Sequence, residues 1–143
     1  MDRMQKVSLA MPVLLSILLM IGCASMGMGK PANVKNVTCG AKTITWEVAK
    51  EAEINNFACN LGTFGIDPSL IFTMDLTNTS DAPLRFRVNI FLEDMDKAAG
   101  HLVPRKGKPP VVEPGQTASI KIPFLKTETL SDKILVIVKA MSE

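Results

Sequence analysis

From residue 34 onward, short runs of the chain alternate between apolar and polar positions. The clearest are 70–77 and 84–92, in which every even position is apolar and most odd positions are polar. Such a period of two is typical of a strand that turns one face to the core. Four further strands are predicted at 34–38, 43–48, 118–124 and 134–140. The last is apolar on both faces, as expected of a central or covered strand.

Turn-forming residues separate these strands. Residues 78–83, Asn-Thr-Ser-Asp-Ala-Pro, have side chains that bond their own backbone, and they are predicted to join 70–77 and 84–92 as an antiparallel hairpin. Residues 113–116, Glu-Pro-Gly-Gln, place Pro and Gly at the centre of a type II turn. Pro123 indicates an edge strand or a strand end. Residues 50–56 are predicted to form one helical turn.

Together these elements predict an all-β fold. Six or seven short strands with turns between them favour an immunoglobulin-like antiparallel β-sandwich over residues 34–143. The single tryptophan, Trp46, is expected in its core.

A long apolar run precedes this domain. Arg3 and Lys6 are followed by about 15 mainly apolar residues, from Val7 to Ile21. That length is short for a membrane span of about 20 residues and is typical of a secretory signal peptide. An uncleaved anchor helix is the alternative interpretation.

The end of the run resembles the bacterial lipobox. Residues 20–23 are Met-Ile-Gly-Cys, with Met20 where the motif usually has leucine. The resemblance implies that residues 1–22 are a lipoprotein signal peptide and that Cys23 is acylated on its sulfur and on its new amino group. Each buried lipid methylene contributes about 0.8 kcal/mol, so two or three chains hold a protein stably at a membrane.

The residues that follow complete this prediction. Residues 23–33 are mostly small and are predicted to be a flexible tether, in which ten extended residues span about 33 Å. By analogy with sorting in enteric bacteria, Ala24 favours the outer membrane, with the domain facing the periplasm. The chain is therefore predicted to be an envelope lipoprotein.

A second resemblance covers roughly residues 70–125. The pattern runs from Asn78-x-Ser80 through the strand 88–94 and Gly100 to the Pro-Gly turn at 114–115. It is similar to the FxLYD-type and YcfL-like small envelope lipoproteins, although Leu92-Glu93 stands where the first family has Tyr-Asp and the chain has no tyrosine. The resemblance implies a fold and an envelope location, and it carries no catalytic residues.

Two cysteines remain for the domain, Cys39 and Cys59. An even pair in an exported chain favours a disulfide. Two buried free thiols, a redox pair or metal ligands are the alternatives, and no Cys-x-x-Cys motif supports the redox interpretation.

The net charge of the domain limits the classes of partner that it is expected to bind. From Cys23 to Glu143 the chain has 14 Lys and Arg against 13 Asp and Glu, which gives no indication of nucleic-acid binding. The basic loop 104–110 is the first candidate contact surface, through Arg105, Lys106 and Lys108, for an envelope protein, the cell wall or an anionic headgroup. Phe91 and Leu125 indicate an apolar patch for association.

Metal binding and catalysis have less support. The acidic run 93–96 lacks the spacing of a calcium loop. Soft ligands for Cu(I) are few, and an alternative carrier function would use Met26, Met28, Met95 and His101. His101 is the only histidine, no Gly-x-Ser-x-Gly motif accompanies it, and an enzyme would need it beside a nucleophile. The sequence thus predicts a non-catalytic binding or structural module without a cofactor, with a periplasmic small-molecule or copper carrier as the alternative.

Overall fold

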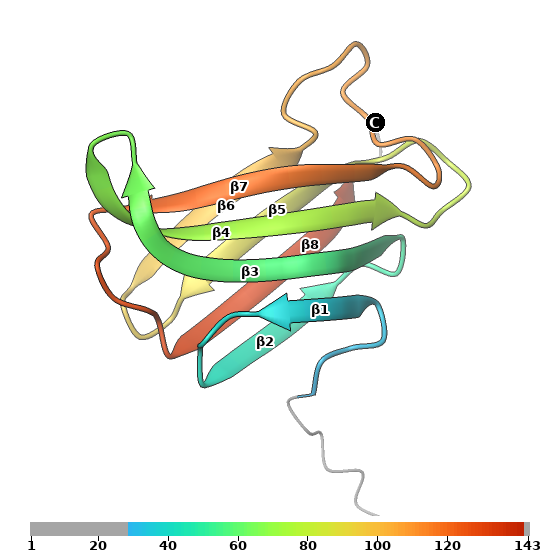
Figure 1. The fold of residues 1–143 in the computed structure, drawn as a ribbon. Helices are drawn as coiled ribbons and strands as arrows, with labels where there is room; N and C mark the ends of the chain where they lie inside the picture. The colour runs from blue at the N-terminus through green and yellow to red at the C-terminus, as the bar shows by residue number, and fades with distance from the viewer. Residues whose placement is uncertain (1–28, 142–143) are drawn as a thin grey trace, which may run out of the picture.

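The computed structural model describes residues 29–141, which form two stacked four-stranded sheets (Figure 1). The first sheet has the strand order β1-β3-β4-β7 and the second β2-β8-β5-β6. The strands are β1 (Val34–Thr38), β2 (Thr43–Val48), β3 (Ala52–Phe64), β4 (Asp67–Asn78), β5 (Arg85–Leu92), β6 (Lys97–Val103), β7 (Thr117–Leu125) and β8 (Lys133–Met141). No helix occurs among residues 29–141, and so none there has the length and apolarity to cross a membrane.

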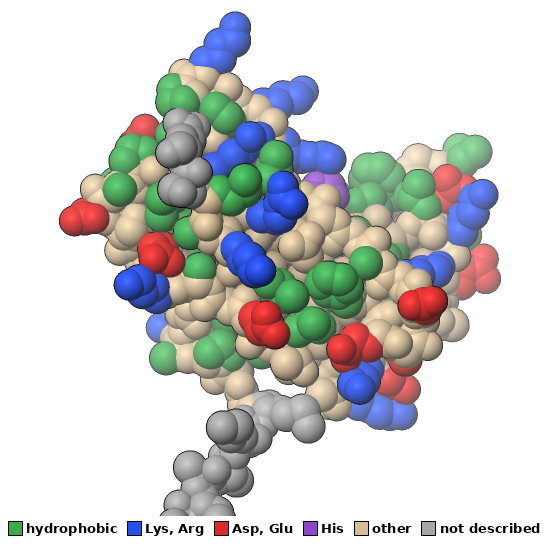
Figure 2. All heavy atoms as spheres, turned by 180° about the vertical axis from the view of Figure 1, so that it is seen from behind, with side chains coloured by type: hydrophobic (Ala, Val, Ile, Leu, Met, Phe, Trp, Pro, Cys, Tyr) green, Lys and Arg blue, Asp and Glu red, His purple; other side chains and the backbone are tan. Residues whose placement is uncertain are grey.

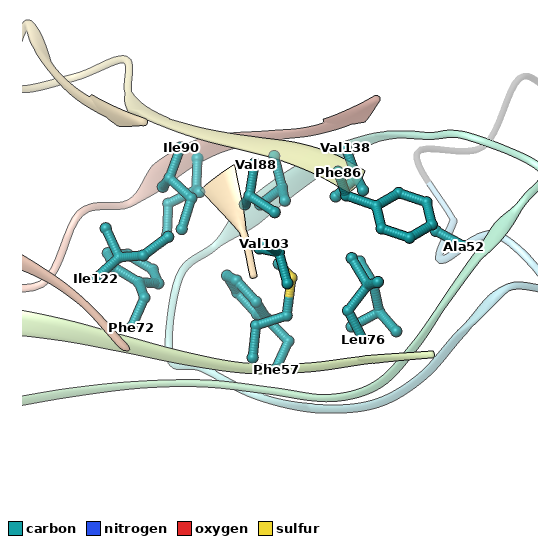
Figure 3. Close-up of a cluster of buried hydrophobic side chains, with 14 of the residues drawn as sticks. Ala52, Phe57, Phe72, Leu76, Phe86, Val88, Ile90, Val103, Ile122 and Val138 are labelled. Carbon is teal, nitrogen blue, oxygen red and sulfur yellow. The ribbon is translucent and has the colours of Figure 1, made fainter. Parts of the chain in front are cut away.

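The alternating positions supply the core between the sheets (Figure 3). From β4 come Leu70, Phe72, Met74 and Leu76, and from β5 come Phe86, Val88, Ile90 and Leu92, all buried. Trp46 packs edge-on against Phe57, with ring centroids 5.0 Å apart, and Phe57 continues to Phe72 at 5.6 Å. Because burial of one such side chain contributes about 1.5–3 kcal/mol, these inward rows explain why the two sheets stack.

The prediction of an all-β sandwich is confirmed, with a different strand count and strand direction. Eight strands are present, and β1 pairs with β3, and β2 with β8, in parallel. The strands predicted at 34–38 and 43–48 are confirmed to the residue. Pro123 lies in β7, which is an edge strand, and β8 is central in the second sheet, as the sequence indicates.

The hairpin predicted between 70–77 and 84–92 is wrong. β4 pairs with β3 and β7 in the first sheet, whereas β5 pairs with β6 and β8 in the second. The turn residues 79–84 therefore carry the chain from one sheet across to the other. Strands that face each other across a core alternate in the same way as strands that pair side by side, so the pattern alone does not separate the two arrangements.

Asn78, at the end of β4, fixes this crossover. Its side chain is fully buried, and its Nδ2 donates to the carbonyl oxygens of Ala82 and Val112, both at 2.8 Å. Its Oδ1 accepts from the backbone N–H of Ser80 at 2.9 Å and from the Ser80 hydroxyl at 2.7 Å. Both donor and both acceptor positions of one buried carboxamide are thus used to hold the crossover between the sheets.

The helical turn predicted over 50–56 is also wrong, since β3 begins at Ala52. Ala52, Ile54 and Phe57 are buried, and the register of β3 against β4 shifts between Ile54 and Asn56. This bulge inserts an extra residue and breaks the period of two. Because of this break, alternation of apolar and polar residues does not predict β3.

The N-terminal edge of the sandwich is tied to its neighbours. A disulfide joins Cys39, just after β1, to Cys59 in β3, with the Cα atoms 4.8 Å apart. Within the stretch predicted as a tether, the Asn33 side-chain amide donates to the carbonyls of Ala49 at 3.2 Å and Ala52 at 3.1 Å. Asn33, which the sequence assigns to the tether, is therefore held to the domain by its side chain. Cys23 and the predicted signal peptide lie outside the described residues.

Replacing Asn78 by leucine should lower the free energy of unfolding by about 2–3 kcal/mol, because two carbonyl oxygens at the crossover lose their donor. Urea denaturation of both proteins measures the difference. Ser80→Ala, which leaves Nδ2 in place, is the control and should cost less than about 1 kcal/mol. Equal losses in the two variants would contradict the assigned role of Asn78.

Removing the disulfide should also be costly. The double variant Cys39→Ala/Cys59→Ala is expected to lose about 3 kcal/mol of stability, the value that chain entropy gives for a loop of this length. The wild-type protein denatured in urea with a reductant should show a similar loss. No change on reduction would mean that the bridge does not constrain the unfolded chain.

Candidate partner-binding cleft

A cleft of about 450 Å³ opens along one edge of the sandwich, beside β7. Its lining residues are Phe64, Pro104, Arg105, Lys106, Ala118, Ser119, Ile120 and Lys121. The loop 104–111 forms one wall and the tip of the β3–β4 hairpin the other. Figure 2 shows this edge hollowed between a lobe rich in Lys and Arg and a lobe with exposed hydrophobic side chains.

The floor of the cleft is the first half of β7. Ala118 and Ile120 pack against the core from the inward face of this strand but stay half-buried, whereas Ile122 and Phe124 further along are buried. On the other face, the Ser119 hydroxyl donates to Asp75 Oδ1 at 2.5 Å, which holds the pKa of that carboxyl below its usual value. The floor therefore offers apolar surface on a strand that is firmly held to β4.

The basic wall is fixed at both of its ends. At one end, Arg85 Nε donates to the carbonyl oxygen of Pro104 at 3.3 Å. At the other, Leu84 and Val112 exchange two backbone hydrogen bonds, at 3.1 and 2.7 Å. The loop thus presents Arg105 and Lys106 from a scaffold anchored beside β5.

The cations of the cleft are available to a ligand. Within residues 29–141 the three ion pairs involve Lys35, Lys42 and Lys133. Arg105, Lys106 and Lys121 belong to none of these pairs, and the lining residues include no carboxylate. The cleft therefore has a local excess of positive charge although the domain as a whole is nearly neutral.

The opposite wall is apolar and exposed. Phe64 is 46 % exposed and Ile66, at the hairpin tip, is 96 % exposed. The turn between them is made by Gly65, whose φ of 64° lies in the left-handed region that favours glycine. An isoleucine left in water beside a half-exposed phenylalanine is surface suited to association.

His101 lies on β6, next to the basic loop, in surroundings that disfavour its protonated form. Burial, and then the positive charge of Arg105, lower its pKa from the ordinary value of 6.5. Its Nδ1 is buried and has no hydrogen-bond partner among the described residues. The residue also lines a separate hollow of about 180 Å³ with Arg87 and Asn89 on the second sheet. No nucleophile appears among the residues that line this hollow.

The structure brings together only some of the predicted contact residues. Arg105 and Lys106 line the cleft, while Lys108 lies on the same loop outside the lining. Phe91 is on the outer face of the second sheet, in a groove of about 470 Å³ with Leu135. Leu125 is exposed at the end of β7, in the first sheet. Phe91 and Leu125 therefore do not form one patch.

The predicted metal ligands are dispersed as well. Met95 lies in the β5–β6 turn, and His101 is near the far end of β6; Met26 and Met28 fall outside the described residues. In the acidic run, Asp94 accepts hydrogen bonds from the Ser131 hydroxyl and the Asp132 N–H, which lower its pKa. No group of three His, Cys, Asp or Glu suited to a metal ion occurs within residues 29–141.

Sequence reasoning missed half of the cleft. Phe64, which lines the cleft, belongs to the β3–β4 hairpin, whose first strand has a bulge that breaks the alternation. Lys121 lies on a predicted strand, at a position that alternation assigns only to the solvent face. The Gly65 turn between two apolar residues was the available signal for the hairpin tip.

The lowered pKa of His101 gives a test by pH. Because its folded pKa lies below 6.5, the unfolded chain binds the proton more readily, so stability falls as the pH drops below about 6.5. NMR titration should place the pKa under that value, and Arg105→Ala should raise it. In His101→Gln the part of the pH dependence between about 6.5 and the folded pKa should disappear. A pKa at or above 6.5 would contradict the assigned environment.

The cleft combines an apolar floor and an apolar wall with three cations that form no ion pair within residues 29–141. It can therefore hold a ligand that is partly apolar and carries negative charge. Comparison with known proteins found no family model, no curated protein and no solved structure that matches this chain.

Proposed function

We propose that this chain is an outer-membrane lipoprotein, anchored through Cys23, whose β-sandwich binds another component of the cell envelope without catalysis. The partner is a protein complex or the cell wall, and the cleft beside β7 is the contact site. The proposal for the anchor rests on the signal-peptide pattern and on the resemblance of residues 20–23 to the lipobox.

The observation that carries the binding function is the make-up of the cleft. Arg105, Lys106 and Lys121 line the cleft with the half-buried Ala118 and Ile120; β7 is paired to β4, and the loop of Arg105 and Lys106 is held at its two ends. Interfaces combine an apolar centre with polar groups at the rim, and charge complementarity speeds encounter and selects the partner. A rigid surface of this kind binds without a large ordering cost.

The topology supports the same proposal. The strand order of the first sheet puts β1, where the N-terminal segment enters, at one edge and β7 at the other. Figure 1 shows residues 29–33, which lead into β1, on the side of the sandwich opposite to the basic loop. The cleft therefore lies at the edge of the first sheet opposite to the one where the proposed anchor segment attaches.

Site-specific photocrosslinking in intact cells tests this function. A photoreactive amino acid at Ile66, at the hairpin tip two residues after the lining residue Phe64, should give one discrete adduct, and the same amino acid at the exposed Glu47 of β2 should not. Charge reversal by Arg105→Glu/Lys106→Glu should reduce the adduct by about tenfold, whereas Lys50→Glu should leave it unchanged.

The anchor is tested in the same cells. Cys23→Ser should release the protein from the membrane fraction and reduce the adduct from Ile66. Equal adducts from Ile66 and Glu47, or none from either, would contradict the contact site. A released Cys23→Ser protein loaded with copper would favour the carrier function instead.

A further inference from the structure

The hydrogen-bonding phase of β7 shows which of its backbone groups face the cleft edge. Asn78 N–H donates to the Gln116 carbonyl at 3.0 Å, which makes this pair a hydrogen-bonded pair. In an antiparallel ladder such pairs alternate with pairs that do not bond each other. The register of β7 on β4 therefore assigns Ala118, Ile120 and Ile122 to the ladder.

The alternate residues of β7 direct their backbone N–H and C=O groups to the other side, away from β4. These are Thr117, Ser119 and Lys121, and Pro123 belongs to the same set. Proline has no N–H to donate, and it is tolerated where that side of the strand is unpaired. The 2.6 Å contact between the hydroxyls of Thr77 and Thr117 agrees with this phase, because side chains lie closest in the non-bonded pairs.

This side of β7 has no partner in the part of the chain that the structure describes. β7 pairs with β4 alone, and no backbone hydrogen bond reaches Thr117, Ser119 or Lys121 from outside the ladder. Two of these residues, Ser119 and Lys121, line the cleft between the basic wall and the hairpin tip. An unpaired edge of this kind is a template for another strand.

We propose that the cleft binds an extended acidic peptide segment of the partner, which adds to the first sheet as a strand beside β7. This inference rests on the proposed binding function and specifies its partner. The backbone N–H and C=O groups of Thr117, Ser119 and Lys121 would form hydrogen bonds with the backbone of the peptide. Its acidic side chains would meet Arg105, Lys106 and Lys121, and its apolar ones Ile120 and Phe64.

Charge selects this occupant. The lining residues hold three cations and no carboxylate, so a peptide with Asp or Glu gains favourable contacts and a basic one meets repulsion. A second copy of the chain is disfavoured for the same reason. Two β7 edges that met would bring Lys121 and the basic loops of both copies together, and lysine on an edge strand is a known barrier to such pairing.

The first experiment uses the lipid-free mature protein and an acetylated eight-residue peptide of alternating Glu and Val. Binding should shift the amide NMR signals of Thr117, Ser119 and Lys121. A peptide with Lys in place of Glu should not bind. Arg105→Glu/Lys106→Glu should weaken binding of the Glu-Val peptide by about tenfold or more.

The backbone bond is tested by a matched pair of variants. Ser119→Pro removes an edge-facing N–H without touching the ladder to β4, and should weaken binding by about tenfold or more. Both variants lose the hydrogen bond from the Ser119 hydroxyl to Asp75. Ser119→Ala keeps the backbone N–H, so its affinity for the peptide should equal that of the wild-type protein. A Glu-Val peptide N-methylated at its four central residues should not bind, which tests the same bond even if Ser119→Pro fails to fold.

The outcomes separate this inference from the proposed function. If the N-methylated peptide, or a folded Ser119→Pro variant, binds as well as its control, strand addition is wrong, and the crosslink from Ile66 still reports on the cleft as a contact site. If no acidic peptide binds while that crosslink persists, the peptide class is wrong. A concentration-dependent dimer with shifts confined to β7 would assign the edge to a second copy and overturn the proposal.

Discussion

The buried carboxamide of Asn78 links the core of this protein to its cleft. Its Nδ2 bonds Val112, where the basic loop ends, and its backbone carbonyl accepts from Gly115 N–H at 2.8 Å in the turn before β7. The same residue also closes the crossover between the sheets through Ala82. Asn78 therefore holds the end of the basic loop through its side chain and the turn before β7 through its backbone, so the geometry of the cleft depends on a residue that no ligand would touch.

Much of the fold could be predicted from the sequence because most strands bury one face only. In β4 from Leu70 to Leu76, and throughout β5, each inward position is apolar, and such regular alternation needs no knowledge of the partner strands. The type II turn at 113–116 was also predictable: Gln116 N–H donates to the Glu113 carbonyl at 2.9 Å, and Gly115 has a φ of 76°. β3 escaped prediction because its bulge after Ile54 moves the buried position from Asn56 to Phe57.

The cleft was less predictable than the fold, for a related reason. The basic wall is local in sequence, so its cations stand out as a run, and Arg105 and Lys106 could be singled out. The other wall depends on where the β3–β4 hairpin goes once the sheets have stacked, and on a β7 edge that stays unpaired. Pairing between distant strands is decided by side-chain packing across the whole core, which a single sequence does not display.

The disulfide at Cys39 and Cys59 has a mechanical consequence. A pull transmitted from the N-terminal segment to a partner held at β7 would cross the first sheet strand by strand, from β1 through β3 and β4, and would leave the second sheet largely outside the load path. The weakest link on that path is the five-residue β1, whose ladder to β3 is short. The disulfide adds a covalent link between the end of β1 and β3. Tension could therefore separate from β3 only the residues before Cys39.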